Sequence, residues 1–214
     1  MARGSLAALS SAALLGLSCG VTALPPTGLP PVSAERAPVV AVVEAQEDAL
    51  SPEDAQIVAA IVDHLTRKRR TGLTEFEREP VARTIVREAR RNNIDPGLVL
   101  VVIHVESRYN AFAVSPVGAM GLMQIMPQTG VELAARAGIP WHGPQILFDP
   151  ILNVRMGVAY LRELADRFGS IEIALAAYNW GPGHIHRRLR RGSPVPVVYP
   201  RLVLDAYTAK ARQS

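Results

Sequence analysis

The fold class depends on residues 95–107, which read DPGLVLVVIHVES. The continuous apolar run over residues 98–103 would suit a buried β-strand, because valine dominates it. Asp95, however, can accept hydrogen bonds from the first free N–H groups of a helix, and Pro96 fits the first helical position. The capping pair and the length of the run therefore predict a helix, with Glu106 one turn beyond its apolar residues.

Glu106 stands out because a carboxylate directly follows this apolar helix. Carboxylates are rarely buried unless a partner compensates their charge. One interpretation is that Glu106 marks the point where the helix reaches water. The other is that apolar surroundings raise its pKa and make it a catalytic acid. The spacing of the residues leaves both interpretations open.

Helical spacing continues through most of the remaining chain, and strand-like alternation is almost absent. The predicted helices run from Ser51 to the basic cluster at residues 67–70, from about Pro80, from Asp149 to Gly169, from Ile171 to about Asn179, and after Pro200. The sequence therefore predicts an all-α fold.

Length and composition exclude several classes of protein. The 214 residues suit one domain with accessory segments, and 49% hydrophobic content argues against a wholly disordered chain. A single cysteine excludes an internal disulfide. The net charge of +4 is low for a nucleic-acid-binding protein, whereas a mildly basic surface suits an anionic polymer such as cell wall.

Residues 1–23 are predicted to be a signal peptide, because the apolar run over residues 6–17 is shorter than the roughly 20 residues that a membrane span needs. Two processing sites compete. Cleavage after Ala23 would follow a small-x-small triplet, whereas residues 16–19 resemble a bacterial lipoprotein box in which Cys19 would carry a lipid anchor. The box has glycine where leucine is usual. Either site predicts export to the periplasm or cell envelope.

Three segments follow the predicted signal peptide. Residues 24–50 contain five prolines without a periodic pattern, which predicts an extended linker. Residues 51–92 are predicted to form a short helical extension. Residues 93–210 are predicted to form the principal domain.

Three motifs, in this order, resemble the catalytic domain of soluble lytic transglycosylases, which has a lysozyme-like fold. The motifs are ESRYN at 106–110 with AVS at 113–115, GAMGLMQIMP at 118–127, and AAYNWGPG at 176–183. The sequence LFDP at 147–150, together with Asn153, also fits the family pattern. The resemblance covers about residues 90 to 207, and the ordered set is far more specific than any one motif.

The resemblance implies that residues 93–210 are a lytic transglycosylase domain acting on the glycan strands of peptidoglycan. Such enzymes cleave the β-1,4 bond between N-acetylmuramic acid and N-acetylglucosamine and leave 1,6-anhydro ends, without a metal or other cofactor. By position, Glu106 would be the single catalytic acid and base. The implied substrate-binding residues are Ser107, Ser115, Gln124, Met126, Tyr178 and Asn179.

The chemistry of bond cleavage agrees with one carboxyl group. A group that protonates a glycosidic oxygen must still hold its proton near neutral pH, which apolar surroundings favour. A two-carboxylate hydrolase needs a second acid, and the motifs contain none besides Glu106. This favours the anhydro-forming reaction. A hydrolytic muramidase on the same fold and a non-catalytic wall-binding protein remain as alternatives.

The chain departs from the family pattern near its carboxyl end. Val195 occupies the position of a family glutamate, whereas Tyr199 fits the family tyrosine. We therefore expect one polar contact of the cleft to be missing. His184 and His186 are two residues apart and do not share a helix face, so no metal site is predicted. The basic run at residues 187–191 suits either a solvated face or contact with an anionic wall polymer.

Overall fold

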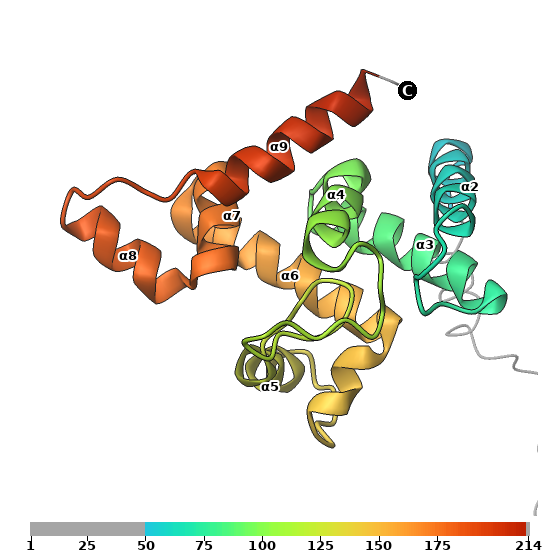
Figure 1. The fold of residues 1–214 in the computed structure, drawn as a ribbon, viewed down its shortest axis with the longest axis horizontal. Coiled ribbons are helices and arrows are strands. Elements are labelled where there is room, and N and C mark those ends of the chain that lie inside the picture. The colour runs from blue at the N-terminus through green and yellow to red at the C-terminus, as the bar shows by residue number, and fades with distance from the viewer. Residues whose placement is uncertain (1–49, 213–214) are drawn as a thin grey trace, which may run out of the picture. The chain divides into compact units, whose positions relative to one another are not determined.

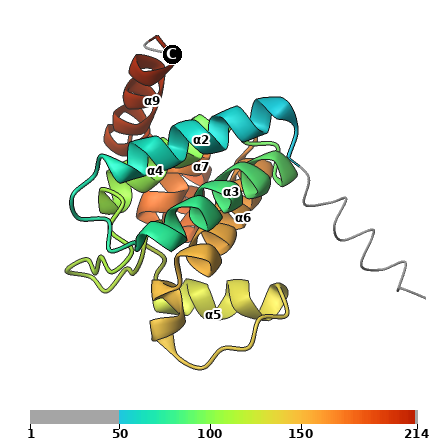
Figure 2. The same ribbon diagram turned by 90° about the vertical axis from the view of Figure 1, so that its right-hand side faces the viewer.

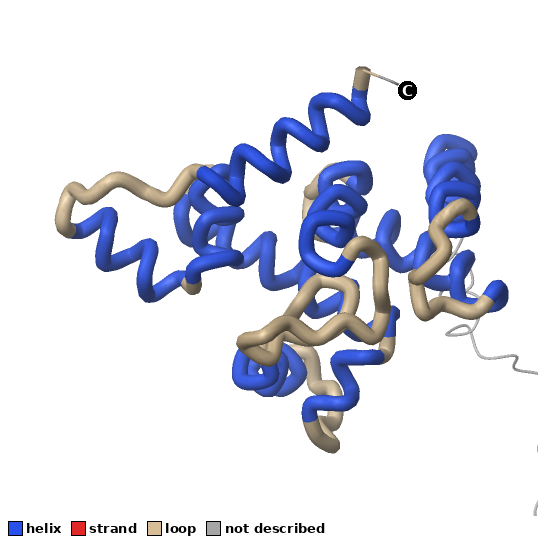
Figure 3. The backbone as a smooth tube through the Cα atoms, in the orientation of Figure 1, coloured by secondary structure: helices blue, strands red, loops and turns tan. Residues whose placement is uncertain are grey.

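The computed structural model describes residues 50–212. The predicted signal peptide, the lipoprotein box at Cys19 and residues 24–49 of the predicted linker lie outside the described residues. Over residues 50–212 the chain forms helices joined by loops, with two isolated β-bridges and no strand (Figure 3). The all-α prediction is confirmed. No helix in this part of the chain is long and apolar enough to cross a membrane.

The elements follow one another along the chain in a simple order. They are α2 (Pro52–Thr66), α3 (Glu75–Arg91), α4 (Pro96–Ser107), α5 (Pro127–Arg136), the 3₁₀ helix η1 (Pro144–Phe148), α6 (Pro150–Phe168), α7 (Ile171–Trp180), α8 (Pro182–Arg190) and α9 (Val198–Ala211).

The start of α4 explains why the valine-rich run is helical. Asp95 Oδ1 accepts hydrogen bonds from the backbone nitrogens of Gly97 (2.7 Å) and Leu98 (3.2 Å). Pro96 occupies the first helical position, where its missing N–H costs nothing. Asp149 caps α6 in the same way. The strand alternative for residues 98–103 is therefore wrong.

Two helices begin earlier than predicted. The predicted start near Pro80 is wrong, because a capping box between Thr74 and Glu77 begins α3 at Glu75. Pro80 is accommodated inside the helix, and the hydroxyl of Thr84 donates to its carbonyl at 2.8 Å. Similarly, α9 begins two residues before Pro200. The short helices α5 and α8 were not predicted.

The helix α4 is enclosed by its neighbours, as Figures 1 and 2 show. α3 and α9 pack against α4, and α6 packs against both α3 and α7. The apolar run over residues 98–103 lies in this main core and is almost completely buried. A smaller apolar cluster lies beneath α5, η1 and the start of α6, and it includes Ile125, Leu133 and Leu147. The long loop between α4 and α5 connects the two clusters.

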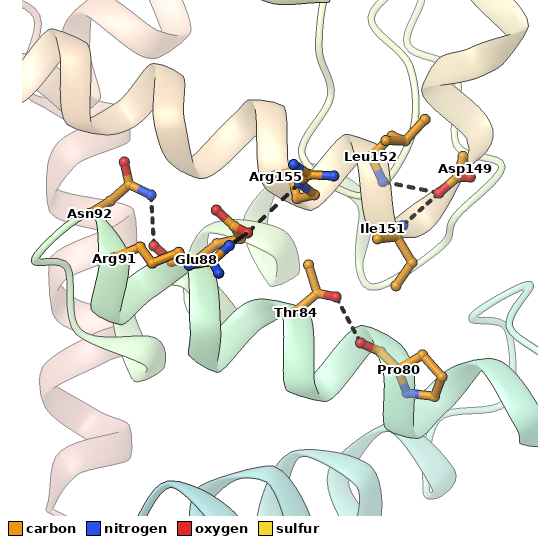
Figure 4. A network of polar contacts seen from close by, with 9 residues as sticks. All are labelled: Pro80, Thr84, Glu88, Arg91, Asn92, Asp149, Ile151, Leu152 and Arg155. Carbon is orange, nitrogen blue, oxygen red and sulfur yellow. Dashed lines mark hydrogen bonds and ion pairs between the residues drawn. The ribbon is translucent and has the colours of Figure 1, made fainter. Parts of the chain in front are cut away.

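A buried carboxylate joins α3 to α6 (Figure 4). Glu88 is 9% exposed, and its Oε1 lies 3.4 Å from Arg91 Nη1 and 3.8 Å from Arg155 Nε. The Glu88 carbonyl accepts a hydrogen bond from Asn92 Nδ2 at 2.8 Å. Two guanidinium groups thus compensate this carboxylate, which gives it a structural role in holding the two helices together.

Candidate active site

The backbone turns sharply directly after Glu106 and Ser107. Arg108 and Tyr109 both adopt left-handed conformations, with φ of 53° and 69°. Such conformations are unfavourable for residues with a side chain and need support from the surroundings. The ring of Tyr109 supplies that support, because it is buried and lies 5.3 Å from the ring of His104. The turn ends α4 and leaves Glu106 in its last turn.

Glu106 is a partly buried carboxyl group with one hydrogen-bond donor from a distant helix. Burial raises its pKa from the usual 4.5 to about 7. The hydroxyl of Tyr199 on α9 donates to Glu106 Oε1, which favours the anion and opposes that rise. Val102 and Ile103, one turn earlier in the same helix, are fully buried and contribute to the apolar surroundings of Glu106. Near neutral pH both protonation states of Glu106 are therefore populated.

Tyr178 on α7 lies close enough to Glu106 to respond to its charge. Burial of its hydroxyl, together with the charge of Glu106, raises the pKa of Tyr178 well above 10. The hydroxyl therefore keeps its proton and donates a hydrogen bond to the backbone carbonyl of Met123 at 2.8 Å. The same two causes keep the Tyr199 hydroxyl protonated, because they raise its pKa as well.

A single buried side chain holds the loop that carries Met123. Asn153 is fully buried on α6; its Oδ1 accepts from the Met123 nitrogen at 2.7 Å, and its Nδ2 donates to the carbonyls of Met120 (3.0 Å) and Leu147 (2.8 Å). Gly121 lies against this amide: a Cβ there would be 2.3 Å from Asn153 Nδ2 and from the Leu147 carbonyl. Asn153 thus positions the backbone group that Tyr178 contacts.

Gln124 follows in the same loop with φ of 50°. Its Nε2 donates to the carbonyls of Ala113 (3.1 Å) and Gly121 (2.9 Å), which uses both amide hydrogens. The amide oxygen is consequently the atom of this side chain that is left for a ligand, and it is an acceptor.

These elements enclose a cavity of about 290 Å³. Its lining consists of Gln124, Ile125, Met126, Thr129, Tyr160, Tyr178, Asn179, Trp180, Gly181 and Pro182. Four of the six predicted substrate-binding residues therefore meet at one site. Glu106 is not part of the lining, but Tyr178 connects it to the cavity. A larger cavity of about 600 Å³ lies between α2 and α4, but its lining includes neither Glu106 nor Tyr178. The volume of a cavity therefore does not by itself identify the site.

Met126, one of the predicted substrate-binding residues, is 41% exposed. It directly precedes α5 and lies at the rim of the cavity.

The two predicted serines make hydrogen bonds within the protein. Ser107 is buried and its hydroxyl donates to the Ile103 carbonyl at 3.1 Å. The hydroxyl of Ser115 accepts from the Ala119 nitrogen at 3.0 Å and closes a tight turn. The Ser107 bond lies within the last turn of α4, whereas the Ser115 bond holds the loop that follows. A direct substrate contact by either serine stays a prediction.

The sequence did not identify Tyr199 as a site residue. The one available signal was its fit to the tyrosine of the family pattern. Val195, at the family glutamate position, packs against the main core. That side chain therefore contributes apolar contact.

Two other carboxylates, Glu163 and Glu132, act on the cavity residue Tyr160. Glu163 is paired with Arg136 at 2.5 Å, whereas Glu132 makes no ion pair within residues 50–212. Burial and Tyr199 account for the pKa of Glu106, with no contribution from a second carboxylate in the described part of the chain. Over residues 50–212, no three histidine, cysteine, aspartate or glutamate side chains gather where they could hold a metal ion.

Comparisons with known proteins identify a family and individual proteins to which this chain is similar. The model of the transglycosylase SLT domain matches residues 83–193. The soluble lytic murein transglycosylase of Salmonella typhimurium is 36% identical over 61% of this chain and 19% of its own length. The transglycosylase of Enterobacteria phage PRD1 is 38% identical over 55% of this chain and 46% of its own length.

Two solved structures are similar as well. An inactive mutant of the lytic transglycosylase Slt from Pseudomonas aeruginosa, in which a glutamate is replaced by glutamine, has a TM-score of 0.54 and 30% identity over 61% of this chain and 24% of its own. The 70-kDa soluble lytic transglycosylase of Escherichia coli has a TM-score of 0.51 and 27% identity over 75% of this chain and 30% of its own. The chain spans less than half the length of each of these four relatives.

Proposed function

Since the chain belongs to the transglycosylase SLT domain family, whose model matches residues 83–193, we propose that it is a peptidoglycan lytic transglycosylase. It cleaves the β-1,4 bond between N-acetylmuramic acid and N-acetylglucosamine and forms 1,6-anhydro ends. The observation that carries this proposal is a single carboxyl group, Glu106, whose pKa burial raises to about 7 beside a cavity lined by family motif residues.

In the first step, protonated Glu106 donates its proton to the glycosidic oxygen as the bond to muramic acid C1 breaks. The departing N-acetylglucosamine leaves with a 4-hydroxyl group. Glu106 becomes a carboxylate, and its charge stabilises the cationic character that develops at C1. The Tyr199 hydroxyl supports this anion by donating a hydrogen bond to it.

In the second step, the C6 hydroxyl of the same muramic acid attacks C1. Glu106 accepts the hydroxyl proton, so the product is the 1,6-anhydro sugar and Glu106 is protonated again. The attacking group belongs to the substrate and is already close to C1, which makes the reaction intramolecular. The cycle consumes no water and needs no second carboxylate.

The cavity residues have roles that follow from their free groups. We assign the Gln124 oxygen to accept a hydrogen bond from a sugar N–H or O–H group, because both amide hydrogens are used within the protein. Tyr178 and Asn179 supply polar groups, and Met126 supplies apolar surface at the rim. Ser107 acts by holding the last turn of α4, and Ser115 by holding the loop that follows it.

Two features of the relatives support this assignment. Proteins named lytic murein transglycosylases match this chain from within longer sequences. The Pseudomonas aeruginosa relative was made inactive by one glutamate-to-glutamine change. A hydrolytic muramidase would need a second group that activates water, and within residues 50–212 no second carboxylate contributes to the pKa of Glu106.

Product analysis of digested cell-wall sacculi tests the proposal. Wild-type protein should release fragments whose ends are one water lighter than reducing ends and resist borohydride reduction. Glu106→Gln should release none, whereas Glu163→Gln, which changes an exposed ion-paired carboxylate, should behave as wild type. Reducing ends would indicate a muramidase. Equal release by wild type and Glu106→Gln would remove Glu106 as the catalyst, and no release at all would indicate a wall-binding protein.

We also propose that the protein acts in the periplasm or cell envelope, where its substrate lies. Relatives named as soluble and as membrane-bound lytic transglycosylases fit either export route. A fatty-acid probe in growing cells distinguishes the routes. Labelling of the wild type that is lost in Cys19→Ala indicates a lipid anchor, and an unlabelled chain beginning at Leu24 indicates plain secretion.

A further inference from the structure

The segment that contains α8 carries positive charge without any acidic residue. Between Glu172 and Asp205 the sequence has no aspartate or glutamate, but it has four arginines at the end of α8 and just after it: Arg187, Arg188, Arg190 and Arg191. No ion pair joins any of these four to a carboxylate elsewhere in residues 50–212. Arg188 instead donates to the carbonyl of Pro194 at 2.6 Å.

One face of α8 is continuous with the cavity. Trp180 lines the cavity, is 54% exposed, and stacks on His184 with ring centroids 5.6 Å apart and planes at 27°. His184, Arg187 and Arg191 follow at spacings of three and four residues, which places them on the same side of the helix. The Arg187 guanidinium turns back toward the first turn of α8, since Nη1 would lie 3.6 Å from a Cβ at Gly183.

The opposite side of α8 faces the protein. α8 packs against α7, away from α2 and α3 (Figure 1), and Ile185 is its fully buried residue. The outer face is therefore exposed and begins at Gly181 and Pro182, which belong to the cavity lining. A ligand that extends out of the cavity on this side meets Trp180 first and the two arginines next.

We infer that the surface formed by Trp180, His184, Arg187 and Arg191 binds the acidic peptide stems of the peptidoglycan strand whose sugars occupy the cavity. This inference rests on the proposed function. The stems branch from muramic acid and carry free carboxylates, and an arginine fork matches a carboxylate with two parallel hydrogen bonds. An exposed tryptophan ring suits the apolar face of a neighbouring sugar. Continuity with the cavity favours a stem over any other anion.

The double variant Arg187→Gln/Arg191→Gln tests the inference, with Arg69→Gln/Arg70→Gln as control. The control removes the same charge from an exposed segment after α2. Each is assayed on uncrosslinked glycan strands with intact stems and on strands from which an amidase has removed the stems. On intact strands we expect the α8 variant to have a KM about fivefold higher than wild type and an unchanged kcat. The effect is modest because exposed ion pairs between arginine and carboxylate contribute little to binding. On stripped strands it should match wild type, and the control should match wild type on both.

Several results would overturn the inference. An equal rise in KM on both substrates would indicate general charge attraction or a structural defect, and unfolding curves of both variants identify the latter. An unchanged KM, combined with arginine-dependent binding to vesicles of phosphatidylglycerol and phosphatidylethanolamine, would assign the surface to lipid.

A binding measurement tests this inference independently of the catalytic proposal, because it uses protein without the Glu106 carboxyl group. The Glu106→Gln protein, with and without the two α8 changes, is sedimented with intact and with stripped sacculi. Stronger binding to intact sacculi that disappears with the α8 changes supports the inference, even if wild type produces no anhydro ends. Equal binding to both sacculi contradicts it.

Discussion

The hydroxyl of Tyr199 donates a hydrogen bond to the carboxylate of Glu106, although 93 residues separate the two in sequence. The contact joins the end of α4 to the first turn of α9. It acts against the effect of burial, because a bond to the charged form lowers the pKa that burial raises. The balance leaves Glu106 able both to give and to accept a proton near neutral pH.

The pH dependence of turnover should report this balance. Because the first step needs protonated Glu106, kcat/KM on glycan strands should fall about tenfold per pH unit above pH 7. Initial rates of anhydro-product release between pH 5 and 9 measure this decline, which is the alkaline limb of the pH–rate profile. A decline that begins near pH 4.5 would show that burial does not shift the group.

Tyr199→Phe should move that limb. Removing the hydroxyl removes the bond that favours the Glu106 anion, so the pKa of Glu106 rises and the decline begins at higher pH. The same pH series on the variant provides the measurement. A limb that stays in place while kcat falls would assign Tyr199 a role in binding the sugar instead.

Stability should change with pH for the same reason. A folded-state pKa above the unfolded value means that the folded state binds more protons, so the free energy of unfolding decreases as pH rises from about 4.5 to about 7. The full loss is about 3 kcal/mol. The Glu106→Gln variant should not show this loss. Its free energy of unfolding should exceed that of wild type by up to this amount at pH 8 and should be similar to that of wild type at pH 4.

Urea unfolding at the two pH values measures this difference. Glu163→Gln is the control, since its carboxylate is exposed and paired with Arg136. If both variants show the same pH dependence as wild type, the carboxyl of Glu106 ionises as it would in water.

Local signals in the sequence predicted the helix that positions Glu106. These signals are the cap at Asp95, the proline after it and the unbroken apolar run. Each acts within a few residues, so its effect can be recognised without knowledge of the tertiary structure. The predicted start of α3 near Pro80 is wrong, because the capping box at Thr74 and Glu77 begins the helix several residues earlier. Pro80 lies inside α3, where its ring removes one backbone hydrogen bond and crowds the carbonyl of Phe76, so a proline alone does not mark where a helix begins.

The partners of the site residues could not be predicted in this way. Tyr199 meets Glu106 only because α9 packs against α4, and that packing depends on many distant contacts. Likewise, the motif identified Ser107 and Ser115 but not the direction of their hydroxyls, which bond inside the protein. Residue type and spacing do not determine which of two partners a hydroxyl selects.

Asn153→Ala should be strongly destabilising. It leaves the Met123 nitrogen and the carbonyls of Met120 and Leu147 without their buried partner. We expect a loss of about 3 kcal/mol or more and reduced turnover, because Tyr178 also contacts Met123. Asn92→Ala, which removes one partly buried bond to a helix carbonyl, should cost less than about 1 kcal/mol. Similar midpoints for both variants in thermal unfolding would contradict this role.

A pair of glycines separates backbone strain from crowding. Both Gly118 and Gly121 have positive φ, of 87° and 79°, so alanine at either is strained by about 1–2 kcal/mol. A Cβ at Gly118 meets nothing within 4 Å, whereas one at Gly121 collides with Asn153 and the Leu147 carbonyl. Gly121→Ala should therefore cost about 2 kcal/mol more than Gly118→Ala in urea unfolding. Equal costs would mean that the loop yields to the added methyl group.

Both amide hydrogens of Gln124 bond to backbone carbonyls, so at this position the cavity offers only a hydrogen-bond acceptor. Toward an incoming molecule this side chain offers lone pairs and no hydrogen, so it attracts edges that carry N–H or O–H groups and repels edges that present oxygen atoms alone. An inhibitor designed for this position should therefore place an amide or hydroxyl hydrogen against it, and an ester or carboxylate in the same place would lose affinity.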